Sequence, residues 1–277
     1  MINLCRQKKL KFILIFLLVF WLLPPVSQAT NLTPEKNMPT EFKIPILMYH
    51  YVETNLQPTD EIRQRLTVTP DYFADQLKSL QSANYQSWFV QDVPDLLTKE
   101  LLPGPNKKPV VLTFDDGYED FYTVAFPLLK KYNFKATIYI IYNLIDHRGY
   151  LTTDQIKELI ASGLVEVGSH TLNHPNLKTV SNEVLRYEIE QSKAKLERKF
   201  DLTIKTFAYP YGAFSPTALA EVQAAGYTAA VSTHPGTYQT VADLFQLNRV
   251  RVLSFSGKHL VQMLDHYFYD HVKNGTL

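Results

Sequence analysis

The chain is poor in cysteine, in excess charge of either sign and in long apolar runs. Its 277 residues include a single cysteine, Cys5, close to the N-terminus. The rest of the chain therefore has neither a disulfide framework nor thiol chemistry. The formal net charge is +1, which gives no indication of nucleic-acid binding. We find no internal repeat and no low-complexity tract, and this excludes a repeat architecture.

The longest apolar run lies at the N-terminus and is typical of a targeting segment. Basic residues from Arg6 to Lys11 precede an apolar run over 12–23, and Ser27–Ala29 offers a small-residue cleavage site. A membrane span needs about twenty apolar residues, so the run favours a signal peptide over 1–29. The alternative is an uncleaved N-terminal anchor. Both interpretations predict a protein that is secreted or held in the cell envelope.

The remainder of the chain alternates between strand and helix patterns after a polar linker over 30–43. Hydrophobic residues make up 45% of the chain and charged residues 20%, which is enough for a core. Strands are expected over 44–49, 110–114, 136–142, 165–167, 206–208 and 228–231. Helices are expected over 121–132, 153–162, 182–200, 216–225 and 258–270, with another that begins at Pro70 after the cap residue Thr69. This alternation predicts one α/β domain over 44–277.

Two adjacent carboxylates end the most informative of these strands. Val110–Phe114 leads directly into Asp115 and Asp116, and Gly117 follows. Carboxylates at the end of a buried strand repel each other and are poorly solvated, so such a pair is typical of a site that holds a cation or moves a proton. The alternative is a simple turn before a helix, because Asp-Gly is a common turn signal.

Two further strand ends carry polar or turn-forming residues. His170 and His174 are four residues apart after the strand over 165–167, and both imidazoles could reach one cation. With one carboxylate they would form a three-ligand zinc set that leaves positions for water and substrate. The alternative is a pair of surface histidines in a polar loop. Pro210 and Gly212 follow the strand over 206–208, where a turn can present a backbone N–H to a developing oxyanion.

Three segments, taken in order, resemble the motifs of the polysaccharide deacetylases: Thr113–Gly117, Ser169–His174 and Pro210–Gly212. This family is also called the NodB-homology group or carbohydrate esterase family 4. The resemblance covers residues 108–277, and Ile44–His50 is similar to the opening strand of members that act on exopolysaccharide. It implies an α/β fold, an irregular (β/α) barrel of about seven parallel strands.

The resemblance also implies roles for individual residues. The first aspartate of the family's pair is the general base, which here is Asp115. The second aspartate and the two histidines bind the metal, which here means Asp116, His170 and His174. Zinc is the expected ion, with cobalt, nickel or iron as alternatives. The backbone N–H of Tyr211 is expected to help hold the oxyanion.

Two features of the family's pattern are missing. Ala208 stands where many relatives carry an arginine that orients the base, and Arg249 or Arg251 could take over that task. A late Leu-x-His, whose histidine is the family's general acid, is also absent. We expect His50 to be the acid, with His234 or a water held by the late arginines as alternatives.

The resemblance implies a metal-dependent hydrolase that removes N-acetyl groups from an extracellular or cell-wall polysaccharide containing N-acetylglucosamine. An O-acetyl esterase of the xylan type and a non-catalytic glycan-binding relative are the alternatives. The expected partner is the polysaccharide, without nucleic acid, and with membrane contact only through an uncleaved N-terminal segment. A monomer is expected.

Overall fold

The computed structural model describes residues 42–54, 59–99 and 101–267. The predicted leader over 1–29 and most of the predicted linker lie outside these residues. The last two residues of that linker form strand β1 (Phe42–Lys43), which pairs with β11 (Tyr238–Gln239). No helix in the described ranges is both long enough and apolar enough to cross a membrane.

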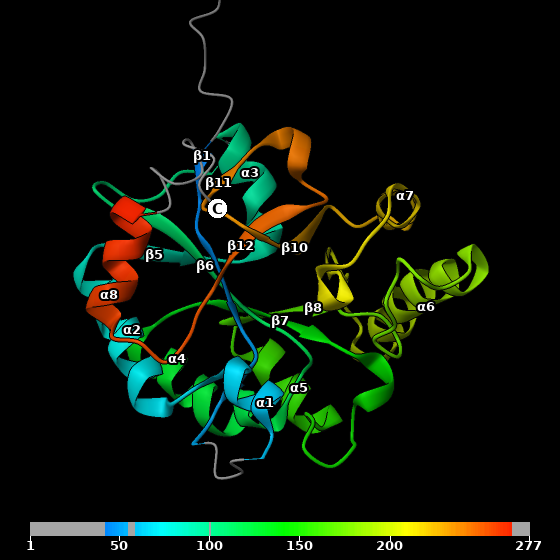
Figure 1. The fold of residues 1–277 in the computed structure, drawn as a ribbon, viewed down its shortest axis with the longest axis horizontal. Helices are drawn as coiled ribbons and strands as arrows, with labels where there is room; N and C mark the ends of the chain where they lie inside the picture. The colour runs from blue at the N-terminus through cyan, green and yellow to red at the C-terminus, as the bar shows by residue number, and fades with distance from the viewer. Residues whose placement is uncertain (1–41, 55–58, 100, 268–277) are drawn as a thin grey trace, which may run out of the picture. The chain divides into compact units, whose positions relative to one another are not determined.

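Among the described residues, seven parallel strands close into a barrel (Figure 1). The strands are β2 (Ile46–Tyr49), β6 (Lys108–Phe114), β7 (Ala136–Ile140), β8 (Val165–Ser169), β9 (Thr206–Ala208), β10 (Ala229–Pro235) and β12 (Leu247–Arg251). Their order is β2-β12-β10-β9-β8-β7-β6, and the pairing of β2 with β6 completes the ring. An additional strand, β5 (Tyr85–Trp88), pairs with the N-terminal part of β6, whereas β7 pairs with its C-terminal end. This extra pairing makes the barrel irregular.

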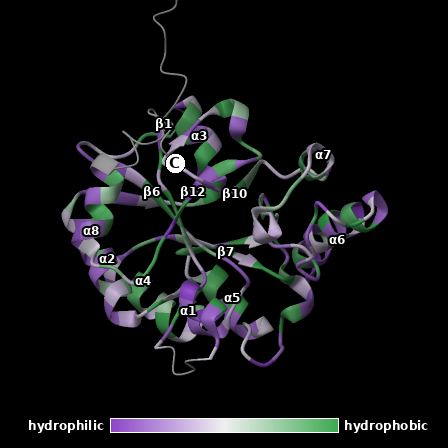
Figure 2. Cartoon of the chain, viewed as in Figure 1, coloured by the Kyte–Doolittle hydropathy of each residue, from purple (hydrophilic) through white to green (hydrophobic). Residues whose placement is uncertain are grey.

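Helices connect the strands and cover the outside of the barrel. They are α1 (Glu61–Leu66), α2 (Pro70–Ser82), α3 (Val93–Thr98), α4 (Phe126–Tyr132), α5 (Thr153–Ala161), α6 (Asn182–Phe200), α7 (Pro216–Ala224) and α8 (Gly257–Gln262). A short parallel pair, β3 (Tyr51–Val52) and β4 (Thr67–Val68), lies outside the barrel sheet. In Figure 2 the strands are mainly hydrophobic and the helices are mixed, as expected for helices with one face on the barrel.

Neighbouring residues of several barrel strands contribute to two different cores. Ile46 of β2 and Val111 of β6 belong to a buried cluster with Tyr139, whereas their neighbours Leu47 and Leu112 belong to the larger cluster that includes helix residues. Side chains of a strand alternate between its two faces. The apolar runs without alternation in the sequence are therefore explained by burial on both faces.

The predicted fold class and strand–helix alternation are confirmed, with local corrections. The expected helix over 182–200 and strand over 206–208 coincide with α6 and β9. The strand predicted over 136–142 ends at Ile140, because Tyr142–Leu144 forms a 3-10 turn. Thr69 precedes α2 as predicted, but its side chain makes no capping hydrogen bond. The closing helix is shorter than predicted: Met263–Tyr267 is a π-helical turn, and 268–270 lie outside the described residues.

Candidate active site

The end of β6 brings both carboxylates to the C-terminal end of the barrel. Asp115 is 4% exposed and Asp116 is 7% exposed. The chain turns sharply here, because Asp116 and Gly117 have φ values of 74° and 78°. A left-handed backbone costs a residue other than glycine on the order of 1–3 kcal/mol and is typical of functional sites. The Asp-Gly turn and the carboxylate site are therefore the same feature.

Arg249 on β12 holds Asp115 through a bidentate ion pair. Its Nη1 and Nη2 atoms lie 2.7 Å and 2.8 Å from Asp115 Oδ1 and Oδ2. The guanidinium is itself buried, and it donates to Ser232 O at 2.7 Å and Thr113 Oγ1 at 3.1 Å. Burial raises the pKa of Asp115, but the charge and hydrogen bonds of Arg249 outweigh it and keep the pKa well below its ordinary value. Asp115 is therefore ionised at neutral pH.

This ion pair accounts for the arginine missing at Ala208. Arg249 contacts Asp115, whereas Arg251, at the end of the same strand, is exposed. The sequence left these two residues open as alternatives because β12 was not expected: Asn248 and the two arginines interrupt its apolar pattern. Ala208 contributes only its backbone to the site, where its carbonyl oxygen accepts a hydrogen bond from His170 Nδ1 at 2.7 Å.

The structure brings together the three predicted metal ligands. Asp116 Oδ1 lies 3.5 Å from His170 Nε2 and 3.4 Å from His174 Nε2, and the three ligand atoms all lie within 4.8 Å of one another. Four-coordinate zinc with bonds of about 2.0–2.1 Å requires ligand atoms roughly 3.4 Å apart. Because Nδ1 of His170 donates to a carbonyl, its Nε2 is free to bind a cation. The three side chains thus fit a divalent metal ion.

The two histidines have different protonation tendencies. Burial acts to lower the pKa of His170, but the hydrogen bond and charge of Asp116, together with Asp115, raise it above its ordinary value. Burial and the neighbouring His170 lower the pKa of His174 to about 4. His174 is therefore neutral at neutral pH, as a metal ligand must be.

Of the two histidines considered as the acid, His50 lies beside the carboxylates. Its Nε2 is 3.9 Å from Asp115 Oδ2, and its side chain is 15% exposed. Burial lowers its pKa, although the charges of Asp115 and Asp116 oppose this effect. His234 is exposed, and its ring lies against Phe214 with the ring centroids 5.6 Å apart.

Tyr211 occupies the turn after β9, next to the histidines. Its φ is 59°, its side chain is 65% exposed, and its ring meets that of His174 edge-on with 4.5 Å between centroids. Gly212 follows with a φ of 64°, and a Cβ atom there would collide with the Thr233 side chain. Glycine is therefore required directly after Tyr211. The backbone hydrogen bonds of this turn come from the Gly212 and Ala213 amides, not from that of Tyr211.

Three tyrosines that the sequence did not single out gather near Asp116. Tyr118 stacks on Tyr51 with 3.9 Å between ring centroids and lies 5.2 Å from Tyr150. Burial and the Asp116 charge both raise the pKa of Tyr118, which stays neutral. Tyr51 directly follows His50 in the sequence, and Tyr118 directly follows Asp116-Gly117. This adjacency to candidate site residues could have identified both tyrosines from the sequence.

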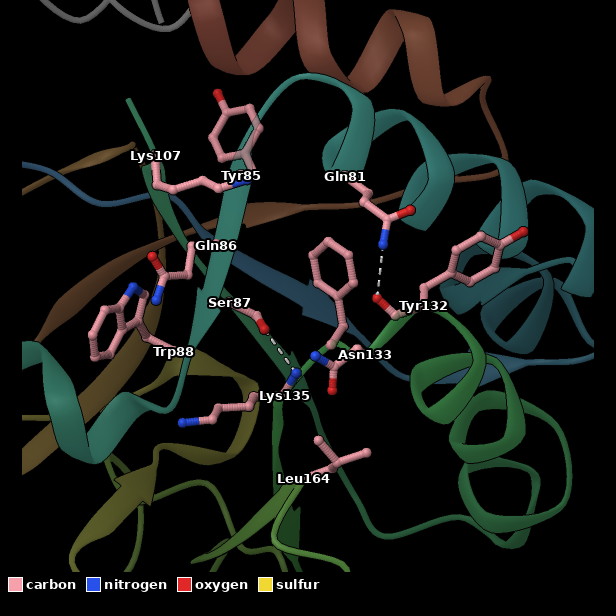
Figure 3. Close-up of a pocket in the computed structure, with 11 residues that line it drawn as sticks. Gln81, Tyr85, Gln86, Ser87, Trp88, Lys107, Tyr132, Asn133, Lys135 and Leu164 are labelled. Carbon is pink, nitrogen blue, oxygen red and sulfur yellow. Dashed lines mark hydrogen bonds between the residues drawn. The ribbon is translucent and has the colours of Figure 1, made fainter. Parts of the chain in front are cut away.

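A separate hollow of about 320 Å³ lies beside β5 and the start of β7, away from these residues (Figure 3). Gln81 Nε2 donates to Tyr132 O at 3.2 Å across it, and the Lys135 amide donates to Ser87 Oγ at 2.8 Å. Lys135 immediately precedes β7, so the hollow belongs to the N-terminal ends of the strands. The carboxylates and histidines lie at the opposite ends and do not line it.

Comparison with known proteins assigns the chain and its fold to a family. The family model described as polysaccharide deacetylase matches residues 103–230. YxkH of Bacillus subtilis (strain 168), which is named as a polysaccharide deacetylase, is 33% identical over 210 residues, covering 76% of this chain and 71% of YxkH. The structure of the Streptococcus pyogenes deacetylase PplD in complex with acetate superposes with a TM-score of 0.75 and 36% identity, covering 82% of this chain and 100% of PplD.

A third relative matches over almost the whole chain. The poly-beta-1,6-N-acetyl-D-glucosamine N-deacetylase of Staphylococcus aureus (strain COL) is 25% identical over 299 residues, covering 98% of this chain and 100% of that protein. The barrel and its site thus define a deacetylase of the NodB type. The chain belongs to the polysaccharide deacetylase family and is a polysaccharide deacetylase.

Proposed function

We propose that the protein is a metal-dependent N-deacetylase of a polysaccharide that contains N-acetylglucosamine. The main support is one arrangement: a buried, arginine-paired Asp115 directly beside a three-ligand set of Asp116, His170 and His174. The full-length similarity to a relative named for N-deacetylation of a poly-N-acetylglucosamine supports the substrate class. The expected ion is zinc, with cobalt, nickel or iron as alternatives.

Each site residue has a distinct task in this proposal. A divalent ion held by Asp116, His170 and His174 would polarise the acetamide carbonyl and lower the pKa of water. Asp115, kept ionised by Arg249, takes the proton from the attacking water. The Tyr211 N–H donates to the carbonyl oxygen as negative charge develops there.

The final proton transfer is assigned to His50. Amide nitrogen is a poor leaving group until it is protonated, and His50 is the histidine that lies 3.9 Å from the base. After the water oxygen has bonded to the carbonyl carbon, protonation of the nitrogen lets the C–N bond break, and the products are acetate and a free amino sugar. Burial lowers the pKa of His50, while the charge of Asp115 acts in the opposite direction and favours the protonated imidazole that this step requires.

The proposed location is outside the cytoplasm, either secreted or in the cell envelope. This follows from the apolar segment over 12–23 with its basic flank and small-residue cleavage site. A polysaccharide substrate in the cell wall or outside the cell agrees with that location.

Release of acetate from two substrates tests the proposal. The purified, zinc-loaded protein should release acetate from oligomers of N-acetylglucosamine faster than from acetylated xylan. Asp115→Asn serves as the matched control for contaminating activity. Faster release from xylan would replace the proposal with O-acetyl esterase activity, and release from neither substrate would favour a glycan-binding role.

A further inference from the structure

The loop that carries both histidines has a backbone that its residues do not favour. It follows β8 directly, and both Thr171 and His174 are left-handed, with φ values of 68° and 57°. A left-handed backbone costs a residue other than glycine about 1–3 kcal/mol, and β-branched threonine is especially disfavoured. Contacts from outside the loop must therefore hold the shape that brings His170 and His174 together.

Glu188, in the middle of α6, supplies three of these contacts. Its Oε2 accepts hydrogen bonds from the backbone amides of Leu172 and Asn173, each at 2.9 Å. Its Oε1 accepts one from Asn173 Nδ2 at 2.6 Å. The side chain is 4% exposed. All three donors belong to the segment between the two histidines, so the carboxylate clamps this segment to the helix.

The partners of Glu188 are the donors of this loop, not a cation. The basic residues of α6 that form ion pairs contact other acids: Arg186 pairs with Glu221, Lys193 with Glu197 and Lys199 with Asp146. Among the residues that the structure describes, no lysine or arginine pairs with Glu188. A buried carboxylate without a cation is costly unless every hydrogen bond to it is made. The hydrogen bonds from the loop therefore account for the burial of the Glu188 carboxylate.

The opposite side of the loop is fixed by the turn after β7. The Tyr142 and Asn143 amides donate to Thr171 O at 3.1 Å and to Leu172 O at 3.0 Å. Asn143 Nδ2 donates to Asn173 Oδ1 at 2.7 Å. Because the Asn173 oxygen accepts from Asn143, its nitrogen must face Glu188. An amide in place of the carboxylate would therefore require Asn173 and Asn143 to turn over together.

We propose that Glu188 is a positioning residue for the metal site. Its carboxylate sets the separation of the His170 and His174 Nε2 atoms by holding the loop between them, and so determines how tightly a divalent ion binds. The inference rests on the proposed metal set. It does not depend on the substrate or on which histidine is the acid.

Glu188→Gln separates this role from simple packing. Glutamine has the same shape, but one of its two terminal atoms is a donor. Its oxygen can still accept from the two backbone amides, but only as a neutral acceptor, and its donor meets Asn173, which must turn over together with Asn143 to accept from it. The hydrogen bonds that hold the loop therefore lose the added strength of a charged acceptor. Groups that orient metal ligands typically change metal affinity 10- to 100-fold when they are mutated. We expect a loss of affinity in that range.

The test is titration of the metal-free protein with cobalt(II) and zinc(II). Cobalt(II) absorption reports the geometry of its ligands, so Glu188→Gln should change the spectrum as well as weaken binding. Asn173→Ala removes one of the three hydrogen bonds to Glu188, together with the one from Asn143, but leaves both backbone amides bound to the carboxylate, so it should have a smaller effect in the same direction. Glu190→Gln is the matched control, because Glu190 is an exposed residue of the same helix.

Two outcomes would overturn the assignment. One is a Glu188→Gln protein that binds cobalt with the wild-type affinity and spectrum. The other is a variant with lower thermal stability but unchanged metal binding, which would make Glu188 a structural residue only. If the wild-type protein binds no metal and Asp116→Ala changes nothing, the proposed metal set itself is wrong, and this result is distinguishable from both.

Discussion

Removal of the Arg249 side-chain charge should affect both stability and turnover. Arg249→Leu leaves Asp115 buried at 4% exposure without its bidentate partner. Breaking a buried ion pair by removing one member costs about 3–5 kcal/mol of unfolding free energy. Arg249→Lys keeps one positive charge but loses the planar fork, and should cost about 1.5–3 kcal/mol. Urea unfolding at pH 7 measures both values.

The pH dependence of this loss has a definite sign. Arg249 lowers the folded-state pKa of Asp115 below the ordinary value of 3.8. The pair therefore contributes stability that is fully present above that ordinary value and is lost as the pH falls through the folded-state pKa. The difference between wild type and Arg249→Leu should be largest near neutral pH and should shrink on acidification.

The pH dependence of turnover should change as well. Without Arg249, burial is left to raise the pKa of Asp115, so the carboxylate takes up a proton at higher pH. The acid limb of the pH–rate profile should move to higher pH in Arg249→Leu. Arg251→Leu, at an exposed position of the same strand, is the control and should be nearly neutral. An Arg249→Leu protein with wild-type stability and an unchanged pH profile would refute the argument.

Three further predictions concern the metal set, the acid and the Tyr211 turn. Asp116→Ala should lose most bound divalent ion and most activity, which elemental analysis and acetate release measure; full activity in chelator-stripped wild type would contradict this. His50→Ala should reduce turnover on an N-acetylated sugar more than on an activated aryl ester, and its metal content should stay intact. His234→Ala is the control and should have the smaller effect. Wild-type activity of His50→Ala on the amide would exclude His50 as the acid. Gly212→Ala should lower thermal stability and turnover together, because its Cβ collides with Thr233 and its φ is 64°; a fully active and stable variant would show that the turn tolerates a side chain.

The sequence predicted the parts of the site that lie in continuous motifs. Asp115, Asp116, His170 and His174 each follow a short apolar strand, and strand ends of a parallel barrel converge. For that reason the local pattern was enough to group one carboxylate with the two histidines, and the family resemblance selected Asp116 as that carboxylate. The structure places the ligand atoms of Asp116, His170 and His174 within 4.8 Å of one another.

The sequence could not predict the contacts that depend on long-range packing. Arg249 reaches Asp115 across 134 positions of sequence, from a strand whose apolar pattern is broken by polar residues. Glu188 reads as one of many charged residues on an amphipathic helix, and only the packing of α6 against the histidine loop reveals its hydrogen bonds. Burial of a polar side chain is set by its tertiary partners, which spacing along the chain does not encode.

The most direct test of the central claim is a paired measurement of metal content and turnover in Asp115→Asn. Asp115 is proposed to transfer the proton, and its neighbour Asp116 to bind the metal. Asp115→Asn should therefore retain a full equivalent of bound divalent ion and lose about a hundredfold or more in acetate release from N-acetylglucosamine oligomers. Loss of the metal in this variant, or turnover equal to wild type, would contradict the account.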